Sequence, residues 1–510
     1  MDEHEGALGG AMASYWMASA PGPARPVLQE DAEADIAVVG GGIAGLCTAR
    51  ELALAGRSVV LVEADRVAAG VTGHTTAKLS AQHGLVYAHL SDAFGADAAR
   101  DYATAQTEAI EHVRRTAEDL GVDCDLETTA SFVYDERDSE TESLQREAEA
   151  AREAGLDAAF TTETGLPFPV AGAVRVEGQA QFHPRKFLLA VAEDLLARGG
   201  RVFEGSRVVD VAAEDGGHRL AVAGGAAIRC REAVIATHYP VVNRARLLSR
   251  LKPRRELVVA APVPADADPG GMYLTTADDT RSVRTAPLPD GRRLLIVTGE
   301  AFTPGEPGVG ERYRTLAAWT ADRFGAKDIA YRWAAQDNGT PDRVPYIGGM
   351  PGGDGLYVAC GFGGWGMSNG MAAARLITGL ATGAPPAWAG LFDPSRLRIM
   401  KEAGPIAANQ KTVMTHLVGD RLRHAPVASA DELDLGQGAV IRVDGRLRAV
   451  YRDDAGDLHT RSAACTHMGC VVGFNDAERT WECPCHGSRF GTDGAVLQGP
   501  ATAPLRDESV

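Results

Sequence analysis

Apolar residues follow three patterns along this chain, and each pattern predicts a different kind of structure. A segment at 35–39 that is apolar after its first residue, a helical stretch that ends at Leu54 and a similar segment at 58–62 predict a strand–helix–strand unit. Helical periodicity returns in two segments rich in Ala, Glu and Arg, 96–120 and 139–154. Alternation typical of strands marks several shorter segments, at 257–262, 272–274, 281–285, 293–298, 438–443 and 447–451.

The composition favours an ordinary globular protein of two or three domains. The chain has 510 residues, of which 45% are apolar and 23% are charged. Its net charge of −17 argues against nucleic acid and anionic membranes as partners; it would suit a basic partner, although many enzymes are simply acidic. The sequence contains no run of 18 apolar residues, so we expect no transmembrane helix. The acidic N-terminus lacks the basic and apolar regions of a signal peptide. We therefore expect a cytoplasmic protein.

A glycine-rich loop joins the first strand to the helix. Residues 40–45 read Gly-Gly-Gly-Ile-Ala-Gly, which completes a G-x-G-x-x-G unit. Gly40 permits the tight turn, Gly42 lets a pyrophosphate approach the backbone, and Gly45 lets helix and strand pack closely. The helix N-terminus faces the phosphates, and Glu63 ends the second strand where it can accept from ribose hydroxyls. This unit predicts a dinucleotide site.

A second strand, glycine loop and helix decide between FAD and NAD. The strand at 355–360 leads into Gly-Phe-Gly-Gly-Trp-Gly-Met at 361–367 and a helix to about residue 379. This segment resembles the flavin-binding segment of the D-amino-acid oxidase-like superfamily, of the glycine and sarcosine oxidase type. The motif Phe-His-Pro-Arg-Lys at 182–186 and the strand at 232–237 extend the resemblance to about residues 30–395. It implies FAD as the cofactor, and the absence of a second G-x-G-x-x-G weighs against a pyridine-nucleotide reductase.

The resemblance and the loop together imply a set of FAD contacts. His238 stands where the family has a glycine, which leaves that backbone contact open. His74 either attaches FAD covalently, as in some relatives, or makes the polar contact that we favour, and Lys78 either faces the flavin ring or is structural. The expected contacts are Gly40, Gly42, Ile43, Ala44, Gly45, Glu63, Ala64, Gly70, Thr72, Gly73, His74, Thr75, Thr76, Lys78, Val208, Ala236, Thr237, Gly361, Gly363, Gly364, Trp365, Gly366 and Met367.

Two Cys/His loops lie near the C-terminus. Residues 465–470 read Cys-Thr-His-Met-Gly-Cys and residues 483–488 read Cys-Pro-Cys-His-Gly-Ser. Each loop supplies a thiolate and an imidazole, which is the ligand set of a Rieske [2Fe–2S] cluster. Zinc is the alternative, but a zinc site would need neither the additional Cys in each loop nor the glycines and serine around the ligands.

The chain resembles the Rieske family over roughly residues 425–510. The resemblance implies four cluster ligands, Cys465, His467, Cys483 and His486. It also implies a disulfide between Cys470 and Cys485 and a hydroxyl donor at Ser488. The Tyr donor of high-potential members is Phe490 here, so we expect a potential within roughly −150 to +300 mV, below the respiratory extreme.

These assignments predict an α/β protein with three domains: a Rossmann-like FAD-binding domain, an α+β substrate domain whose mixed sheet roofs the flavin, and a small all-β Rieske domain. The expected segments are a leader at 1–34, the FAD-binding domain at 35–85, 172–250 and 330–390, the substrate domain at 86–171 and 251–329, a linker at 391–425 and the Rieske domain at 426–510.

The expected activity is oxidation of a C–N bond in a small amine or amino acid by FAD, as the resemblance implies. Electrons would then pass singly through the cluster to a carrier protein or a quinone-type acceptor. A reductase that runs in the opposite direction and a redox sensor without a substrate are the alternatives. The candidate catalytic residues are Lys78, Arg284 and Tyr273; Arg284 or its neighbour Arg281 could bind a carboxylate or be a surface charge.

Overall fold

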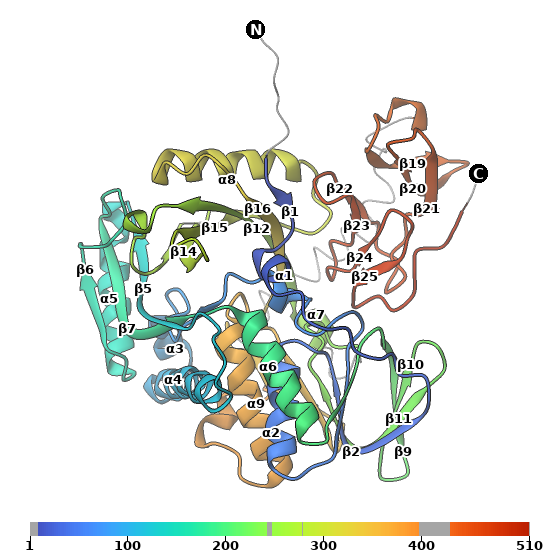
Figure 1. Cartoon of the computed structure of the whole chain (residues 1–510), viewed down its shortest axis with the longest axis horizontal. Coiled ribbons are helices and arrows are strands. Elements are labelled where there is room, and N and C mark those ends of the chain that lie inside the picture. Colours follow the sequence, from blue (N-terminus) through green and yellow to red (C-terminus); the bar gives the residue numbers. More distant parts are fainter. Residues whose placement is uncertain (1–8, 242–246, 278, 397–428, 509–510) are drawn as a thin grey trace.

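The computed structural model describes residues 9–241, 247–277, 279–396 and 429–508 of the chain. Two large sheets make up most of the described molecule, and a separate β module lies at one end, away from α5 and β6 (Figure 1). Most of the expected linker, 391–425, lies outside the described residues. Within the described ranges no helix is both long and apolar enough to cross a membrane.

The eight-stranded sheet contains the predicted strand–helix–strand unit. Its central strands pair in parallel, whereas β17 pairs with β18 antiparallel and β9 and β10 extend from β11 as an antiparallel ribbon. Its strands are β17 (Tyr346–Gly349), β18 (Leu356–Cys360), β11 (Ala227–Ile235), β2 (Ala32–Val39), β3 (Val59–Val62), β8 (Arg201–Phe203), β9 (Val208–Glu214) and β10 (Gly217–Val222).

Helices cover one face of this sheet and share a continuous apolar core with it. Continuous apolar runs such as Val59–Val62 are buried on both faces, as expected of parallel strands in an α/β fold. The helices whose apolar residues join this core are α2 (Ile43–Leu54), α3 (Tyr87–Phe94), α4 (Ala96–Asp119), α5 (Thr141–Glu153), α6 (Pro184–Ala197) and α9 (Gly366–Thr382).

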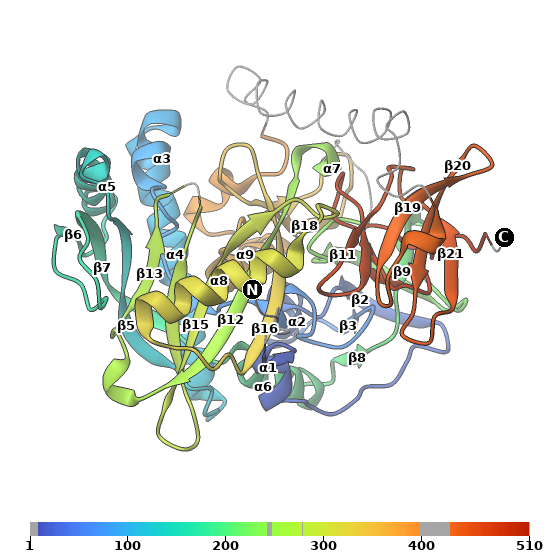
Figure 2. The same cartoon turned by 90° about the horizontal axis from the view of Figure 1, so that it is seen from above.

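The ten-stranded sheet is mixed, as predicted for the roof. Helix α8 (Val309–Phe324) packs on β12 and β15; it lies along one side of this sheet in Figure 1 and passes over its strands in Figure 2. The strands, in spatial order, are β1 (Ala11–Met12), β16 (Tyr331–Gly339), β12 (Lys252–Val263), β15 (Arg293–Phe302), β14 (Ser282–Pro287), β13 (Met272–Thr275), β5 (Glu127–Asp135), β7 (Gly172–Gln181) and β4 (Lys78–Leu79), with β6 (Ala158–Thr161) paired to β7.

The ten-stranded sheet takes strands from segments that we expected elsewhere. β7 and β16 were expected within the FAD-binding segments 172–250 and 330–390, yet both pair in this sheet. The leader at 1–34 is also not merely extended, since it contains β1 and the short helix α1 (Tyr15–Ser19). Trp16 is fully buried and its Nε1 donates to the Thr75 carbonyl at 2.7 Å, so burial of an aromatic side chain holds the leader on the sheet. The domain boundaries themselves stay a prediction.

The C-terminal module consists of two small antiparallel sheets, which confirms the predicted all-β domain. Trp481 and Phe490 are fully buried at its centre, together with the four cysteines of the two loops. The strands are β19 (Gly438–Val443), β20 (Arg446–Arg452), β21 (Leu458–Ser462), β22 (Gly473–Asn475), β23 (Thr480–Glu482), β24 (Arg489–Phe490) and β25 (Val496–Gln498). The remaining helix of the described residues, α7 (Leu247–Arg250), precedes β12.

Candidate functional site

A cavity of about 1350 Å³ lies where the two large sheets and the β module meet. The roof strands β12, β14, β15 and β16, the loop at 69–78 and the glycine loop after β18 all contribute to its walls. The β module closes part of the wall with Glu478, Arg489 and residues 497–502. All of the expected FAD contacts line this cavity except Gly45 and Gly73. The residues predicted to contact FAD therefore surround one space, and their contact with FAD stays a prediction. Nothing in the sequence indicated that the β module lines the same space.

The glycine loop after β2 has the close approaches that the motif requires. A Cβ on Gly40, which has φ +109°, would lie 2.4 Å from the Ala236 carbonyl oxygen. A Cβ on Gly45 would lie 1.8 Å from the Gly40 carbonyl oxygen, so this glycine serves packing rather than contact with a ligand. Glu63 accepts from the Gly41 N–H at 2.6 Å, and burial raises its pKa. A buried acid beside a loop whose Gly42 lines the cavity fits the ribose and pyrophosphate of a dinucleotide.

His238 stands where the family has a glycine, and its backbone conformation shows whether the path of the chain is kept there. It adopts φ +64°, the left-handed conformation that a glycine takes without strain and other residues take rarely. The backbone at this point therefore follows the path of a glycine despite the side chain. His74, the candidate for covalent attachment, lies with Nδ1 at 2.9 Å from the Gly70 carbonyl oxygen, and burial lowers its pKa. Its attachment to FAD stays a prediction.

The three candidate catalytic residues occupy different places. Lys78 is buried on β4, lines the cavity and donates from Nζ to the Tyr273 carbonyl. Burial, and next to it the charge of Arg284, lower its pKa to about 7. Tyr273 donates its hydroxyl to the Pro269 carbonyl at 2.8 Å and is fully buried in the core under α8.

The two roof arginines are already bound by the protein. Arg284 donates to the Ala77 carbonyl at 2.9 Å and lies over the Trp16 ring at 5.3 Å. Arg281 donates to Glu300 at 2.6 Å, on the opposite face of the sheet from Ser282. Among the described residues that line the cavity, neither arginine nor Tyr273 is present. The predicted roles of Arg281 and Arg284 in binding a carboxylate, and of Tyr273 in catalysis, gain no support from this geometry and stay predictions.

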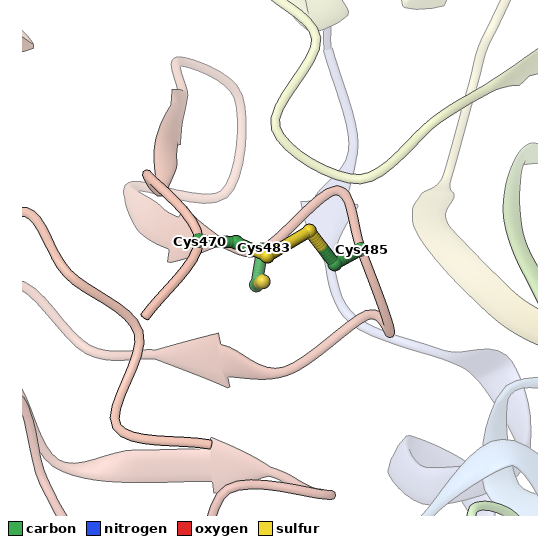
Figure 3. A group of neighbouring side chains, drawn as sticks. All are labelled: Cys470, Cys483 and Cys485. Carbon is green, nitrogen blue, oxygen red and sulfur yellow. A yellow bond between two sulfur atoms is a disulfide. The ribbon is translucent and has the colours of Figure 1, made fainter. Parts of the chain in front are cut away.

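The two Cys/His loops converge in the β module. Cys470 and Cys485 form the predicted disulfide, and Cys483 lies beside it (Figure 3). The rings of His467 and His486 are 4.9 Å apart and nearly perpendicular. Their Nδ1 atoms are buried and have no hydrogen-bond partner among the described residues.

This donor set fits a Rieske cluster. Cys465 and Cys483 are in side-chain contact, and Ser488 is hydrogen-bonded to Cys465. Burial lowers the pKa of His486 to about 4 and lowers that of His467, which keeps both imidazoles in the neutral form that binds metal. Two adjacent thiols and two unpartnered imidazole nitrogens would hold the two unlike irons of a [2Fe–2S] centre.

Strand β16 connects the cluster loop to the glycine loop of the flavin site. Gln336 donates from Nε2 to the Gly487 carbonyl at 3.0 Å, next to His486, a predicted cluster ligand. The following residue, Asp337, accepts from the N–H of Gly364 in the flavin loop. The Tyr239 ring, which follows the flavin-site strand β11, lies 5.7 Å from the ring of His486. The cluster loop is therefore in direct contact with both sheets that enclose the cavity.

Buried charges hold the β module in this position. Arg255 of β12 is fully buried and pairs with Glu478 and Glu482 of the module. Arg489 pairs with the same two carboxylates at 3.1 and 3.3 Å. Although burial alone would raise it, Arg255 and Arg489 bring the pKa of Glu478 down to about 2. Asp476 also accepts from the Val309 N–H at 2.8 Å, at the N-terminus of α8.

Comparison with known proteins gives two family matches. Residues 35–380 match the family described as FAD dependent oxidoreductase, and residues 423–507 match the Rieske [2Fe-2S] domain. A putative Rieske 2Fe-2S iron-sulfur protein of Bacillus subtilis (strain 168), YhfW, is 33% identical over 97% of each chain.

Two further relatives cover the larger part of the chain only. Gamma-glutamylputrescine oxidoreductase of Escherichia coli (strain K12) is 25% identical over 72% of this chain and 89% of its own. The crystal structure of glycine oxidase from Geobacillus kaustophilus has a TM-score of 0.60 at 20% identity, and the match covers 72% of this chain and 99% of that chain. The structural likeness shows that the matched part of the described chain shares the fold of this glycine oxidase.

Proposed function

Since the chain belongs to the FAD dependent oxidoreductase family and carries a Rieske [2Fe-2S] domain, we propose that it oxidises a C–N bond of an amine or amino acid and passes the electrons singly through the cluster to an external acceptor. FAD would take two electrons from the substrate, whereas a Rieske cluster accepts one at a time. The acceptor would be a carrier protein or a quinone-type molecule.

One observation carries this proposal: the cluster loop contacts the walls of the flavin cavity. The contacts of Gln336 with Gly487 and of Tyr239 with His486 support an internal route for electrons. The relatives support the substrate class, because they include a glycine oxidase and a gamma-glutamylputrescine oxidoreductase, and glycine and gamma-glutamylputrescine are both amino compounds. The volume of the cavity favours an enzyme over a sensor, because it exceeds the range of about 300–1,000 Å³ that is common for ligand pockets.

An anaerobic titration with amines and amino acids tests the proposal. We expect at least one compound to bleach the flavin absorbance, followed by the EPR signal of the reduced cluster. Reduction of the cluster by a reduced ferredoxin-like protein, with no bleaching by any amine or amino acid, would instead show a reductase that runs in the opposite direction.

Within this proposal, Lys78 takes the proton that the substrate nitrogen loses. The pKa of Lys78 is lowered to about 7, so its amine is neutral and able to accept a proton above that pH. We expect the second-order rate of anaerobic flavin reduction to rise with pH through about 7 and then to level off. In Lys78→Arg the rise of the rate near pH 7 should disappear, and the rate should fall by about 10²–10⁴-fold, because a guanidinium stays charged and cannot accept the proton. An unchanged limb near pH 7 in Lys78→Arg would exclude Lys78 as its origin.

A further inference from the structure

Neighbouring strands of the roof place one row of uncharged side chains over the cavity. Val258 of β12 lies opposite Thr298 of β15, Thr298 lies opposite Ser282 of β14, and Ser282 lies opposite Leu274 of β13. All four side chains line the cavity. Directly opposite residues point to the same face of a sheet, so the register alone produces this row. The side chains that face the cavity from this row are therefore small or medium in size, and the two at its centre carry hydroxyl groups.

Thr298 offers a hydrogen-bonding group that the protein does not use. Its residue is 4% exposed, and its Oγ1 is buried with no hydrogen-bond partner among the described residues. A buried hydroxyl without a partner destabilises the folded protein unless a ligand or a water molecule supplies the missing hydrogen bond. Because Thr298 lines the cavity, this hydroxyl points to a ligand in the roof site.

Negative charge lies at one end of the row. Glu256 precedes Val258 by two residues on the same face of β12 and also lines the cavity. Burial raises its pKa, and the neighbouring carboxylate of Asp337 raises it further, whereas Arg254 and Lys78 lower it. Arg254 approaches Glu256 at 3.1 Å, but its side chain is 48% exposed, so solvent screens this pair.

The positive groups near the row are weak counterweights to these two acids. Lys78 is neutral for much of its population near pH 7, and its Nζ is directed to the Tyr273 carbonyl. Arg284, the other cation that faces Lys78, donates to backbone carbonyls and does not line the cavity. Burial likewise favours the neutral form of Glu256, so the negative potential at this end of the roof comes from Asp337 and from Glu256 in its ionised form, which a bound cation stabilises and a carboxylate does not.

We propose that the roof site binds a cationic amine, with Glu256 accepting hydrogen bonds from a substrate ammonium group and Thr298 hydrogen-bonding to the same substrate. Glu256 is a specificity-determining residue that disfavours amino acids whose carboxylate would enter the roof site. This inference rests on the proposed function and narrows its substrate class from amines and amino acids to amines with positive charge.

Binding of two nearly isosteric ions to the holoprotein tests the proposal by calorimetry. tert-Butylammonium has no hydrogen on the carbon that bears nitrogen and cannot be oxidised to an imine, and trimethylacetate has similar shape with negative charge. We expect the cation to bind at least about tenfold more tightly than the anion, because hydrogen bonds to charged groups are the strong ones. Glu256→Gln should weaken cation binding at least about tenfold, and Thr298→Val by a smaller factor.

Glu306→Gln is the matched control, because Glu306 also lines the cavity and pairs with an arginine at 3.1 Å, as Glu256 does, but lies in the loop after β15 and not on the strands of the row. Its cation affinity should stay at the wild-type value. Equal or tighter binding of trimethylacetate, or unchanged cation binding in Glu256→Gln, overturns the inference. These outcomes are separate from the fate of the proposed function: oxidation of amino acids without a preference for cations would sink the inference alone, and cation binding without oxidation of any amine would sink the proposed function alone.

Discussion

A Cys483→Ser variant should still have its flavin reduced by substrate but should lose turnover with a one-electron dye. Cys483 is one of two adjacent thiols in the cluster loops, so its loss removes a ligand that no other described thiol can replace, because Cys470 and Cys485 are joined. Loss of an outer partner of a metal ligand typically costs about 10–100-fold in activity, so loss of the ligand itself should cost at least about 100-fold in dye-linked turnover.

The measurement compares two rates in one preparation. Stopped-flow reduction of the flavin by substrate should be unchanged, whereas steady-state reduction of the dye should fall. Cys230→Ser is the control, since Cys230 is buried in β11 and far in sequence from the cluster loops. Equal dye-linked rates in wild type and Cys483→Ser would show that electrons leave the flavin directly and would remove the case for the cluster as a relay.

Local chemistry explains why so much of the site could be predicted from the sequence. The turn at Gly40 and the packing at Gly45 leave no space for a Cβ, so the positions of these glycines in the sequence are enough to predict the close backbone contacts. The Rieske loops are equally local, because each supplies one thiolate and one imidazole within four residues. His238 shows the limit of such reasoning, since the sequence marked it as unusual but only the structure shows that it keeps the left-handed backbone of a glycine.

The differences between prediction and structure concern the direction of side chains and contacts between distant segments. Arg281 and Arg284 lie on the predicted roof strand, but strand periodicity places them on opposite faces, and the sequence alone could not assign the faces. The leader was expected to be extended because its prolines dominate the pattern, whereas burial of Trp16 decides its structure. No periodicity reports a contact such as that of Arg255 with Glu482, which are 227 residues apart.

That contact leads to the largest expected effect on stability. Arg255→Met should destabilise the docked Rieske module by about 3–5 kcal/mol, because it leaves Glu478 and Glu482 buried with only Arg489 as a counterion. The side chains of Arg255 and Glu482 are both fully buried, so water cannot compensate for the lost charge unless the interface opens. Thermal unfolding, followed through the visible absorbance of the cluster, should show an earlier transition for the variant.

Two matched variants separate charge from packing. Arg254→Met changes the neighbouring residue of the same strand, whose side chain is half exposed, and should shift stability by no more than about 0.5 kcal/mol. Arg255→Met with Glu482→Gln removes one of the stranded charges and should recover part of the loss, because replacing a buried ion pair costs far less than breaking it. The single variant Arg255→Met should also slow electron transfer from flavin to cluster without slowing flavin reduction. The contacts of Gln336 with Gly487 and of Tyr239 with His486 depend on the docked position of the module. If Arg255→Met unfolds no earlier than Arg254→Met, the buried charges do not hold the module, and its position must depend on the contacts around Gly487 instead.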